Sequence, residues 1–516
     1  MATTNPFLTP LIEQVVPSAV SLKDKLTHAG VGQSRYEGLY TPITGGGAYS
    51  AGGSGTKLMT FKLTGADYTD LSTLMLSLLV APDVSSANYC IEEGILSLFQ
   101  QVTVRIGGVQ LFTITDFPAV YNVLVSQAMP KAVYENDGPA QGLWKSNPNL
   151  LGTLTAAGAV SGYQYNHAGG GGGGVAGATG AYDDTKHISA RITANQWFSS
   201  TGRFYNVPLG FLFSGLSTYF PLRNVSNIEI EFLLQSSIGS CIVPTVPVAY
   251  GTAAPATPPT QLNVNEAELR VDHVRCSPDL YALMDSEIRE GSGVTLAIDL
   301  HTHIPFSQSA GSNTVASEKA LQTAQSIRFL KSISCITRPT AFLNDPTCSK
   351  SNFGNHQFGQ FRCLVNGMSY PQVPITKCWD AYQEAKKTQN KLGHLTGDSV
   401  TTYDNWTGPS LVQEVASIGG SRDGSWWGSA PADDSRFIPS INFETFLTSR
   451  DSDLDGVNLA ESAGSLVEVR LTNAPCTAIW TGAAAVTPTA ANATFGVILH
   501  HTGILAIRGG AVEFLK

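Results

Sequence analysis

Three aspartates in the last quarter of the chain have the spacing of calcium ligands. Asp451, Asp453 and Asp455 alternate along the sequence and are followed by Gly456. Calcium loops place oxygen ligands at alternate positions and use a glycine for the sharp turn. The twelfth position, where such a loop has a bidentate glutamate, is Ser462. The sequence leaves open both a calcium site and an acidic turn that faces solvent, and we assign no metal ligand.

Two histidine pairs have spacings that could ligate a metal. His301 and His303 are alternate residues, which share one face of a strand, and His500 and His501 are adjacent. A zinc site needs further ligands, and neither pair has an identifiable third one. We therefore expect strand histidines that hydrogen-bond to their neighbours, and we predict no metal or cofactor site.

The remaining motifs also lack the context that chemistry needs. The glycine run 169–174 superficially resembles a phosphate-binding loop, but no strand pattern precedes it and no Gly-Lys-Ser/Thr or helix pattern follows. An exposed flexible loop explains it better. Nucleophile-elbow, zinc-protease and Cys-His signatures are absent, and Glu229 and Glu231 show ordinary strand alternation. We predict no catalytic residue, and only an acid pair of the glycosidase kind stays open.

A long irregular segment, residues 394–435, carries three tryptophans among Gly, Ser and Asp. These are Trp406, Trp426 and Trp427. Exposed aromatic side chains would suit contact with a partner or a glycan. Aromatic side chains that fold a long loop onto its own domain are the commoner outcome. Both interpretations are open.

The elements that must position these residues lie on either side of a central helix. Ser277 suits the N-cap, Pro278 the first turn and Gly291 the C-terminal end, so we predict a helix over 277–291. Its apolar residues fall on one helical face. They are Leu280, Leu283, Met284 and Ile288.

The sequences before and after this helix show the same features in the same order. A strand, a tight turn and a helix start occur at 102–121 and again at 361–382. A long irregular stretch, an Arg-Phe pair, an apolar strand, an Ala/Pro/Thr-rich segment and a closing strand then follow in both halves. The shared order predicts a tandem duplication of one fold. At the start of each half we match 57–63 and 71–80 with 293–304 and 326–337. The later matches are Arg203 with Arg436, 227–233 with 465–471, and 267–274 with 495–507.

The composition is that of an all-β protein. Charged residues make up 14% of the 516 residues, while glycine (51) and proline (27) are abundant, which suits many turns and long loops. The formal net charge is −9, and the first fifty residues carry only Lys23, Lys25 and Arg35 as basic side chains. An arm that neutralises phosphates needs a dense basic cluster, so we expect no direct nucleic-acid binding.

No pattern near Met1 resembles a signal peptide, and no apolar run approaches the roughly 20 residues that span a bilayer. The eight cysteines lack Cys-x-x-Cys pairs and zinc-finger spacing, which indicates buried free thiols in a reducing compartment. We therefore expect a soluble protein that is not exported through a cleaved signal.

The chain divides into four parts by these criteria. We predict an N-terminal arm (1–54), a first β-rich unit (55–276), the linker helix (277–291) and a second β-rich unit (292–516). The arm ends in glycine-rich sequence and cannot bury much surface alone. Its apolar residues predict that it orders against a neighbouring subunit; they are Phe7, Leu8, Leu11, Ile12 and Val15.

This organisation resembles the double jelly-roll major capsid proteins of icosahedral double-stranded DNA viruses. The resemblance rests on the turns at 106–109 and 365–368, the stretch 208–222 before the strand at 228–233, and the strand at 267–274 that runs into the linker helix. Length and loop pattern are most similar to virophage and polinton-like virus capsid proteins. The chain lacks the tyrosine-rich acidic strand motif of the large nucleocytoplasmic virus subgroup, which leaves the lineage open.

The resemblance implies an all-β fold of two tandem eight-stranded jelly rolls joined by a short linker helix, with small helices and long loops. It implies a non-enzymatic major capsid protein of the virion, made and assembled inside the host cell. Three chains would form a pseudo-hexameric capsomer that tiles an icosahedral shell. The implied partners are its own copies, neighbouring capsomers, penton proteins and minor capsid proteins, with outer loops in contact with the host surface. The alternative is a double jelly-roll carbohydrate-active enzyme or glycan-binding protein that uses the tryptophan-bearing segment.

Overall fold

The computed structural model describes most of the chain between residues 34 and 515. The described residues are 34–44, 49–84, 89–91, 94–143, 152–154, 160–162, 202–216, 219–244, 258–290, 293–309, 317–324, 327–340, 343–344, 350, 353, 358–376, 378–388, 399–401, 406, 436–444, 456–459, 466–473 and 492–515. Asp451, Asp453, Asp455, the glycine run 169–174, Trp426, Trp427 and the first 33 residues lie outside them, and so do the predictions made for them.

The first half of the chain forms a jelly roll of two antiparallel sheets. One sheet has the order β1-β13-β4-β10, with β2 also paired to β13, and the other has the order β3-β11-β6-β7. The strands are β1 (Ser34–Tyr40), β2 (Tyr49–Gly52), β3 (Leu58–Leu63), β4 (Tyr68–Pro82), β6 (Phe99–Ile106), β7 (Val109–Thr115), β10 (Arg203–Pro208), β11 (Ile228–Leu234) and β13 (Gln261–Arg275). The helix α3 (Phe117–Ala128) follows β7.

The second half repeats the order of the eight main strands in the two sheets. Its sheets have the orders β14-β21-β16-β19, with β22 paired to β21, and β15-β20-β17-β18. The strands are β14 (Val294–Ser309), β15 (Ser317–Ala324), β16 (Phe329–Pro339), β17 (Phe358–Val365), β18 (Met368–Ile375), β19 (Ser440–Asn442), β20 (Leu466–Asn473), β21 (Asn492–Arg508) and β22 (Ala511–Leu515). The helix α7 (Cys378–Lys387) follows β18, as α3 follows β7. The predicted duplication and the all-β class are confirmed.

The two rolls are joined by α6 (Pro278–Glu290), the predicted central helix. Ile288 is buried, as expected, while the side chains of Leu280, Leu283 and Met284 lie outside the described set. Shorter elements complete the fold: β5 (Tyr89–Ile91), η2 (Ile95–Leu98), α4 (Lys131–Asn136), η3 (Gly138–Gln141), β8 (Gly152–Leu154), β9 (Val160–Gly162), η4 (Gly210–Phe213), η5 (Leu222–Asn224), η6 (Ile238–Ser240) and β12 (Ile242–Pro244).

One part of the predicted match between the halves is wrong. We matched 57–63 with 293–304, but the topology makes β14 the counterpart of β1, and β15 the counterpart of β3. The predicted arm was also too long, because β1 and β2 lie within 1–54 and both pair with β13. The physical reason is exposure. β1 is an edge strand whose side chains are mostly exposed, so it lacks the apolar alternation that marks a strand in a sequence.

Each core fills the space between the two sheets of a roll. In β11, Ile228, Ile230 and Phe232 are buried while the residues between them are partly exposed, which is the period-two pattern of a strand with one covered face. The Phe232 ring packs edge-on against Phe61, at 5.9 Å between centroids, and contacts Phe99 in a tilted arrangement at 4.8 Å. Such pairs add about 0.5–1.5 kcal/mol each beyond area burial.

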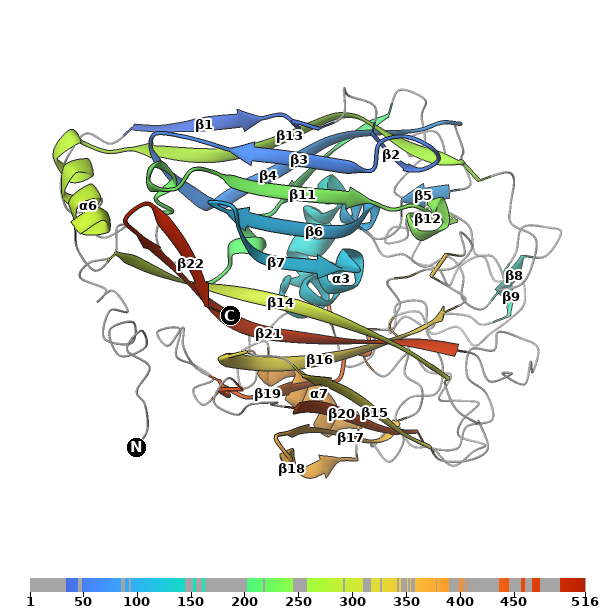
Figure 1. The fold of residues 1–516 in the computed structure, drawn as a ribbon. Coiled ribbons are helices and arrows are strands. Elements are labelled where there is room, and N and C mark those ends of the chain that lie inside the picture. The colour runs from blue at the N-terminus through green and yellow to red at the C-terminus, as the bar shows by residue number, and fades with distance from the viewer. Residues whose placement is uncertain are drawn as a thin grey trace, which may run out of the picture.

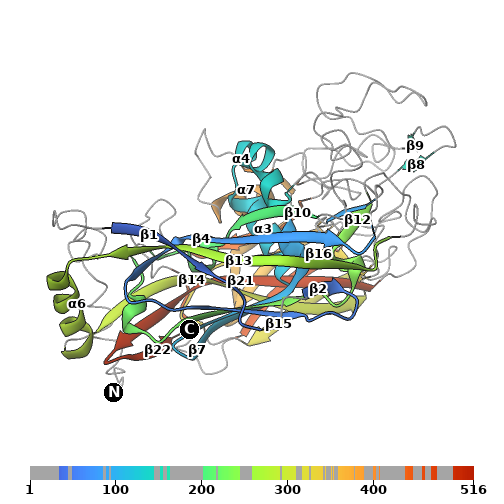
Figure 2. The same ribbon diagram turned by 90° about the horizontal axis from the view of Figure 1, so that it is seen from above.

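The two rolls are stacked one upon the other. Figure 1 shows β14 and β21 of the second roll beneath β7 of the first, with α6 linking the rolls at one end. The same view places β1 and β13 at one extreme of the stack and β18 at the other. In Figure 2, seen from above, β4, β13, β14 and β21 all lie along roughly the same axis. The candidate functional site lies where the two rolls meet.

Candidate functional site

The start of α3 in the first roll is anchored to the second roll by an ion pair. Asp116 precedes the helix with left-handed backbone angles, φ 52° and ψ 53°, and its carboxylate pairs with the Arg338 guanidinium on β16. The Arg338 side chain is only 5% exposed, against 31% for Asp116. Burial opposes ionisation of Asp116. The charges of Arg338 and His303, together with hydrogen bonds from Arg338 and the Ala119 backbone, outweigh burial and hold the pKa of that carboxyl below its usual value.

The end of α3 makes a second set of buried polar contacts with the second roll. Arg436, which is fully buried, donates through Nη1 to Ser126 Oγ at 2.7 Å. Gln127 Nε2 donates to Ser440 Oγ on β19 at 3.0 Å. The backbone N–H of Thr401 donates to the Ser126 carbonyl at 3.1 Å. Since buried polar groups are costly when unpaired, these bonds fix the orientation of α3 on the β16–β19 edge.

The predicted histidine pairs lie on β14 and β21, in the sheet that faces the first roll. His301 and His500 are cross-strand partners whose rings stack at 4.7 Å with an interplanar angle of 2°. Thr302 Oγ1 and His501 Nε2 are 3.0 Å apart, within hydrogen-bond distance. Burial lowers the pKa of His500, and lowers that of His301 well below its usual value. Among the described residues, no group of three or more His, Cys, Asp or Glu side chains could hold a metal ion.

Asp299 gives the histidine pair a charged neighbour. Its carboxylate accepts from Lys331 Nζ at 2.7 Å and from Thr502 Oγ1 at 3.1 Å, and lies 4.0 Å from His500 Nε2. Burial raises the pKa of Asp299, but His500 and Lys331 outweigh it, so the pKa lies below its usual value. The backbone N–H of Asp299 also donates to the Ser214 carbonyl of the first roll at 2.7 Å. This cluster therefore belongs to the contact between the rolls.

The linker helix α6 is tied to the first roll by its own contacts. Asp285 accepts from Arg223 Nη2 and from Asn224 Nδ2, both at 2.8 Å. The Arg223 guanidinium lies 3.9 Å from the centre of the Tyr281 ring, a cation–π contact. Tyr281 Oη in turn donates to Asp67, before β4. The backbone N–H of Gly509 in the second roll donates to the Ile288 carbonyl of α6 at 2.9 Å, so α6 contacts both rolls.

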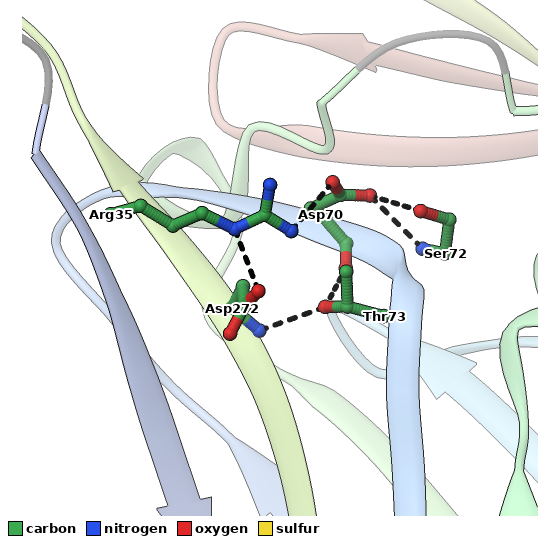
Figure 3. Close-up of polar contacts among 5 residues, drawn as sticks. All are labelled: Arg35, Asp70, Ser72, Thr73 and Asp272. Atoms are coloured by element: carbon green, nitrogen blue, oxygen red, sulfur yellow. Dashed lines mark hydrogen bonds and ion pairs between the residues drawn. The ribbon is translucent and has the colours of Figure 1, made fainter.

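One face of the first roll carries a network of partly exposed charged side chains. On the β1-β13-β4-β10 sheet, Arg35 donates to Asp272 at 2.6 Å and to Asp70 at 3.2 Å, which links three strands (Figure 3). Figure 3 also shows Ser72 bonded to Asp70, and Thr73 bonded to the Asp272 backbone. Three apolar side chains of the same sheet are also exposed; they are Leu39, Met75 and Phe204.

The outer edge of the second roll is also exposed. β18 pairs only with β17 among the described strands. Met368 and Val373 on β18 and Trp379 on α7 are all exposed, and the Trp379 ring lies 6.0 Å from that of Tyr382. Exposed apolar groups of this kind mark contact surfaces when they gather at one edge.

Trp406 does not form the exposed aromatic platform that the alternative function needs. Its side chain is 1% exposed and packs between Phe437, at 5.0 Å between ring centroids, and Tyr382, at 5.7 Å. The second interpretation given for the tryptophan segment, an aromatic residue folded onto its own domain, is therefore confirmed for Trp406.

Sequence reasoning missed the residues that join the rolls. The helix start within 102–121 gave no role for Asp116, and Arg436 was matched only with Arg203 as part of a repeated Arg-Phe pair. Asp116 and Arg338 are 222 positions apart, and Arg436 and Ser126 are 310 apart. The one available signal was a charged residue inside an apolar strand, as Arg338 is in β16, since such a residue needs a partner when the strand is covered on both faces.

Two docked jelly rolls of identical topology define a double jelly-roll protein. Comparison of the sequence with protein-family models and with curated proteins finds no match. Solved structures do match. The chain aligns with the PBCV-1 virus capsid with a TM-score of 0.54 at 11% identity, over 94% of this chain and 97% of that one. The Sputnik virophage gives 0.51 at 9% identity, over 94% and 88%. The mavirus major capsid protein gives 0.50 at 10% identity, over 93% and 89%. The chain thus has the double jelly-roll fold of these viral structures.

Proposed function

We propose that this chain is a major capsid protein that assembles as a homotrimer and tiles the shell of an icosahedral virion. The observation that carries the proposal is the fold match over 94% of the chain to the PBCV-1 virus capsid. A chain built from two rolls of one topology supplies six similar edges when three copies meet, which suits a pseudo-hexagonal building block.

The contact between the rolls supports this function physically. A building block that repeats across a lattice must hold its two halves in one geometry, because a variable angle would spread the lattice contacts over many positions. The Asp116–Arg338 pair, whose guanidinium is buried, and the Arg436–Ser126 bond oppose such variation. These groups thus serve assembly, and none of them needs a catalytic role.

The proposal also includes the other proteins that the chain would contact in a shell. We expect neighbouring capsomers, penton proteins at vertices and minor capsid proteins as partners, with residues 1–33 ordered against a neighbouring subunit. No direct nucleic-acid binding is expected from the acidic chain, whose net charge is −9. Calcium binding by Asp451, Asp453 and Asp455 stays open.

The test is the mass of the purified protein in solution by light scattering, followed by negative-stain imaging of the same fraction. The expected species has three times the chain mass of 54.7 kDa and appears as a hexagonal plate. A monomer that forms no assembly at any concentration would contradict the proposal.

A further inference from the structure

The edge strand β1 covers one histidine of its neighbour β13. His273 is only 2% exposed, and the strand register places it opposite Tyr36. Its Nε2 lies 2.8 Å from Tyr40 Oη, and its ring centroid lies 5.3 Å from that of Tyr36. Between these two tyrosines, a Cβ on Gly38 would lie 2.4 Å from His273 Nε2. Three alternate residues of β1 therefore pack on a single imidazole.

The hydrogen bonds around the ring assign one neutral form to His273. Tyr40 has a single hydroxyl proton, which it donates to the Thr64 carbonyl at 2.8 Å. Tyr40 Oη can then only accept, so Nε2 of His273 carries the ring hydrogen. Nδ1 is left as an acceptor, and Thr69 Oγ1 donates to it at 3.0 Å. Both ring nitrogens are satisfied in the neutral ring, whereas a proton on Nδ1 would displace the bond from Thr69.

The two carboxylates that act on His273 already have cationic partners. Asp67 lies 3.5 Å from Arg275 Nε, and Asp272 accepts from Arg35 at 2.6 Å (Figure 3). Burial lowers the pKa of His273, although both carboxylates act in the opposite direction. The titratable and charged residues on the surrounding elements are Arg35, Tyr36, Glu37 and Tyr40 on β1, Asp67 and Asp70 at the start of β4, Arg223 on η5, Asp272 and Arg275 on β13, and Tyr281 on α6. A proton on His273 would therefore add a positive charge to a set in which the acting carboxylates are already paired.

β1 is the part of this cover that can leave at the lowest cost. It is an edge strand, it pairs only with β13 among the described strands, and most of its residues are exposed. Its charged anchor, Arg35, has a side chain that is 48% exposed, so water and salt weaken the ion pairs that it makes. Movement of β1 away from β13 would bring the His273 ring into water, where the charged imidazolium is hydrated.

We propose that β1 is a strap that is closed over neutral His273 and released when this histidine is protonated. Above about pH 6.5, the ordinary value for histidine, the ring is neutral and the strap stays closed. Below it, the open form binds the proton more readily than the closed form, so acid favours opening. Release detaches Ser34–Tyr40 from the sheet while β13 stays paired with β4. The strap needs no second subunit, so it operates in the single chain.

The first experiment follows hydrogen exchange by mass spectrometry in the peptide that contains Ser34–Tyr40, at pH 7 and at pH 5. The urea-unfolded chain at the same pH supplies the reference rate. We expect the protection of β1 to fall several-fold in acid, and by no more than about thirtyfold, while β11 stays protected. His273→Gln should abolish this response. His303→Gln, at a histidine of the second roll that is 6% exposed, is the matched control and should keep it. Equal protection at both pH values in the wild type, or an acid response that persists in His273→Gln, would overturn the proposal.

The second experiment opens the strap at neutral pH by steric means. Gly38→Ala places a methyl group against the His273 ring, so the protection of β1 at pH 7 should fall on the order of tenfold. Gly65→Ala is the control, because its Cβ would lie 3.6 Å from His273 Cε1, and it should leave β1 protected. Wild-type protection in Gly38→Ala would contradict the assigned contact. If His273→Gln loses the protection of β11 as well and thus fails to fold, Tyr40→Phe replaces it. Tyr40→Phe removes the acceptor of Nε2–H and should lower the protection of β1 at pH 7.

Discussion

Arg338 on the second roll and Asp116 on the first form an ion pair across the contact between the two halves of the chain, although 222 positions separate them. The guanidinium is almost completely buried and the carboxylate starts α3. A charge in this position is stable only with its partner, since an isolated buried ion loses its hydration. The pair therefore couples the correct folding of each roll to their docking.

Removing one partner of this pair should be costly. Asp116→Asn leaves the Arg338 charge buried and unpaired, and we expect the free energy of unfolding to fall by roughly 3 kcal/mol. The matched control is Arg35→Gln, which breaks the ion pairs of Figure 3 at a guanidinium that is 48% exposed. That change should cost less than about 1 kcal/mol. Urea unfolding measures both, and equal losses would contradict the assigned importance of the inter-roll pair.

Stability should decline as the pH falls below about 6.5, the ordinary value for histidine. Burial lowers the pKa of His301, His303 and His500, so the folded protein holds them neutral. The unfolded chain binds protons first, so their contribution is complete above about 6.5 and decreases below it, by at most about 1.4 kcal/mol per pH unit for each group. Asp116 and Asp299 have lowered pKa values, so their contribution is complete above about 4 and is lost as the pH falls through the folded values.

The measurement is the thermal midpoint between pH 7 and pH 5 in the wild type and in a His301→Gln, His500→Gln double variant. The double variant should lose less stability over this interval than the wild type. A wild-type midpoint that does not change between these pH values would contradict the prediction.

Alanine substitutions in the turn between β6 and β7 should reveal how closely this turn packs against the second roll. A Cβ on Gly107 would lie 2.8 Å from Val512 Cγ2 on β22, while one on Gly108 would meet nothing within 4 Å. Both residues have positive φ, 57° and 84°. Gly108→Ala should therefore cost only the backbone strain of about 1–2 kcal/mol, and Gly107→Ala about 1–3 kcal/mol more. Adding Val512→Ala should recover the extra loss, because the two sites couple by contact. Equal unfolding energies for the two alanine variants would contradict this account.

Trp406 should behave as a core residue. Trp406→Ala removes a buried ring from between Tyr382 and Phe437, and we expect the free energy of unfolding to drop by about 3–5 kcal/mol. Trp379→Ala, at an exposed ring, should change the stability of the monomer by less than about 1 kcal/mol. Loss of glycan binding in Trp406→Ala without loss of stability would revive the carbohydrate-binding alternative.

Buried thiols should resist alkylation in the folded protein. Burial raises the pKa of Cys335 to about 12 and of Cys276 to about 11, and Cys363 is raised as well. The thiolate is the reactive form, so labelling at these positions should require unfolding. Peptide mapping after iodoacetamide treatment, with and without urea, measures this. Fast native labelling of Cys335 would show that β16 opens.

Local sequence patterns determined the repeated unit. The alternation in β11, the turns after β6 and β17 and the capping residues of α6 all depend on neighbours a few positions away, so they could be identified without any knowledge of distant contacts. These features sufficed for the duplication and the central helix, whereas the jelly-roll class was inferred from the resemblance to double jelly-roll capsid proteins.

The tertiary structure alone decided how the repeated units are used. It placed the poorly patterned β1 in the first sheet, buried Trp406 and joined Asp116 to Arg338. Such relations depend on packing between residues hundreds of positions apart, and a local pattern carries no information about which distant surface will cover it.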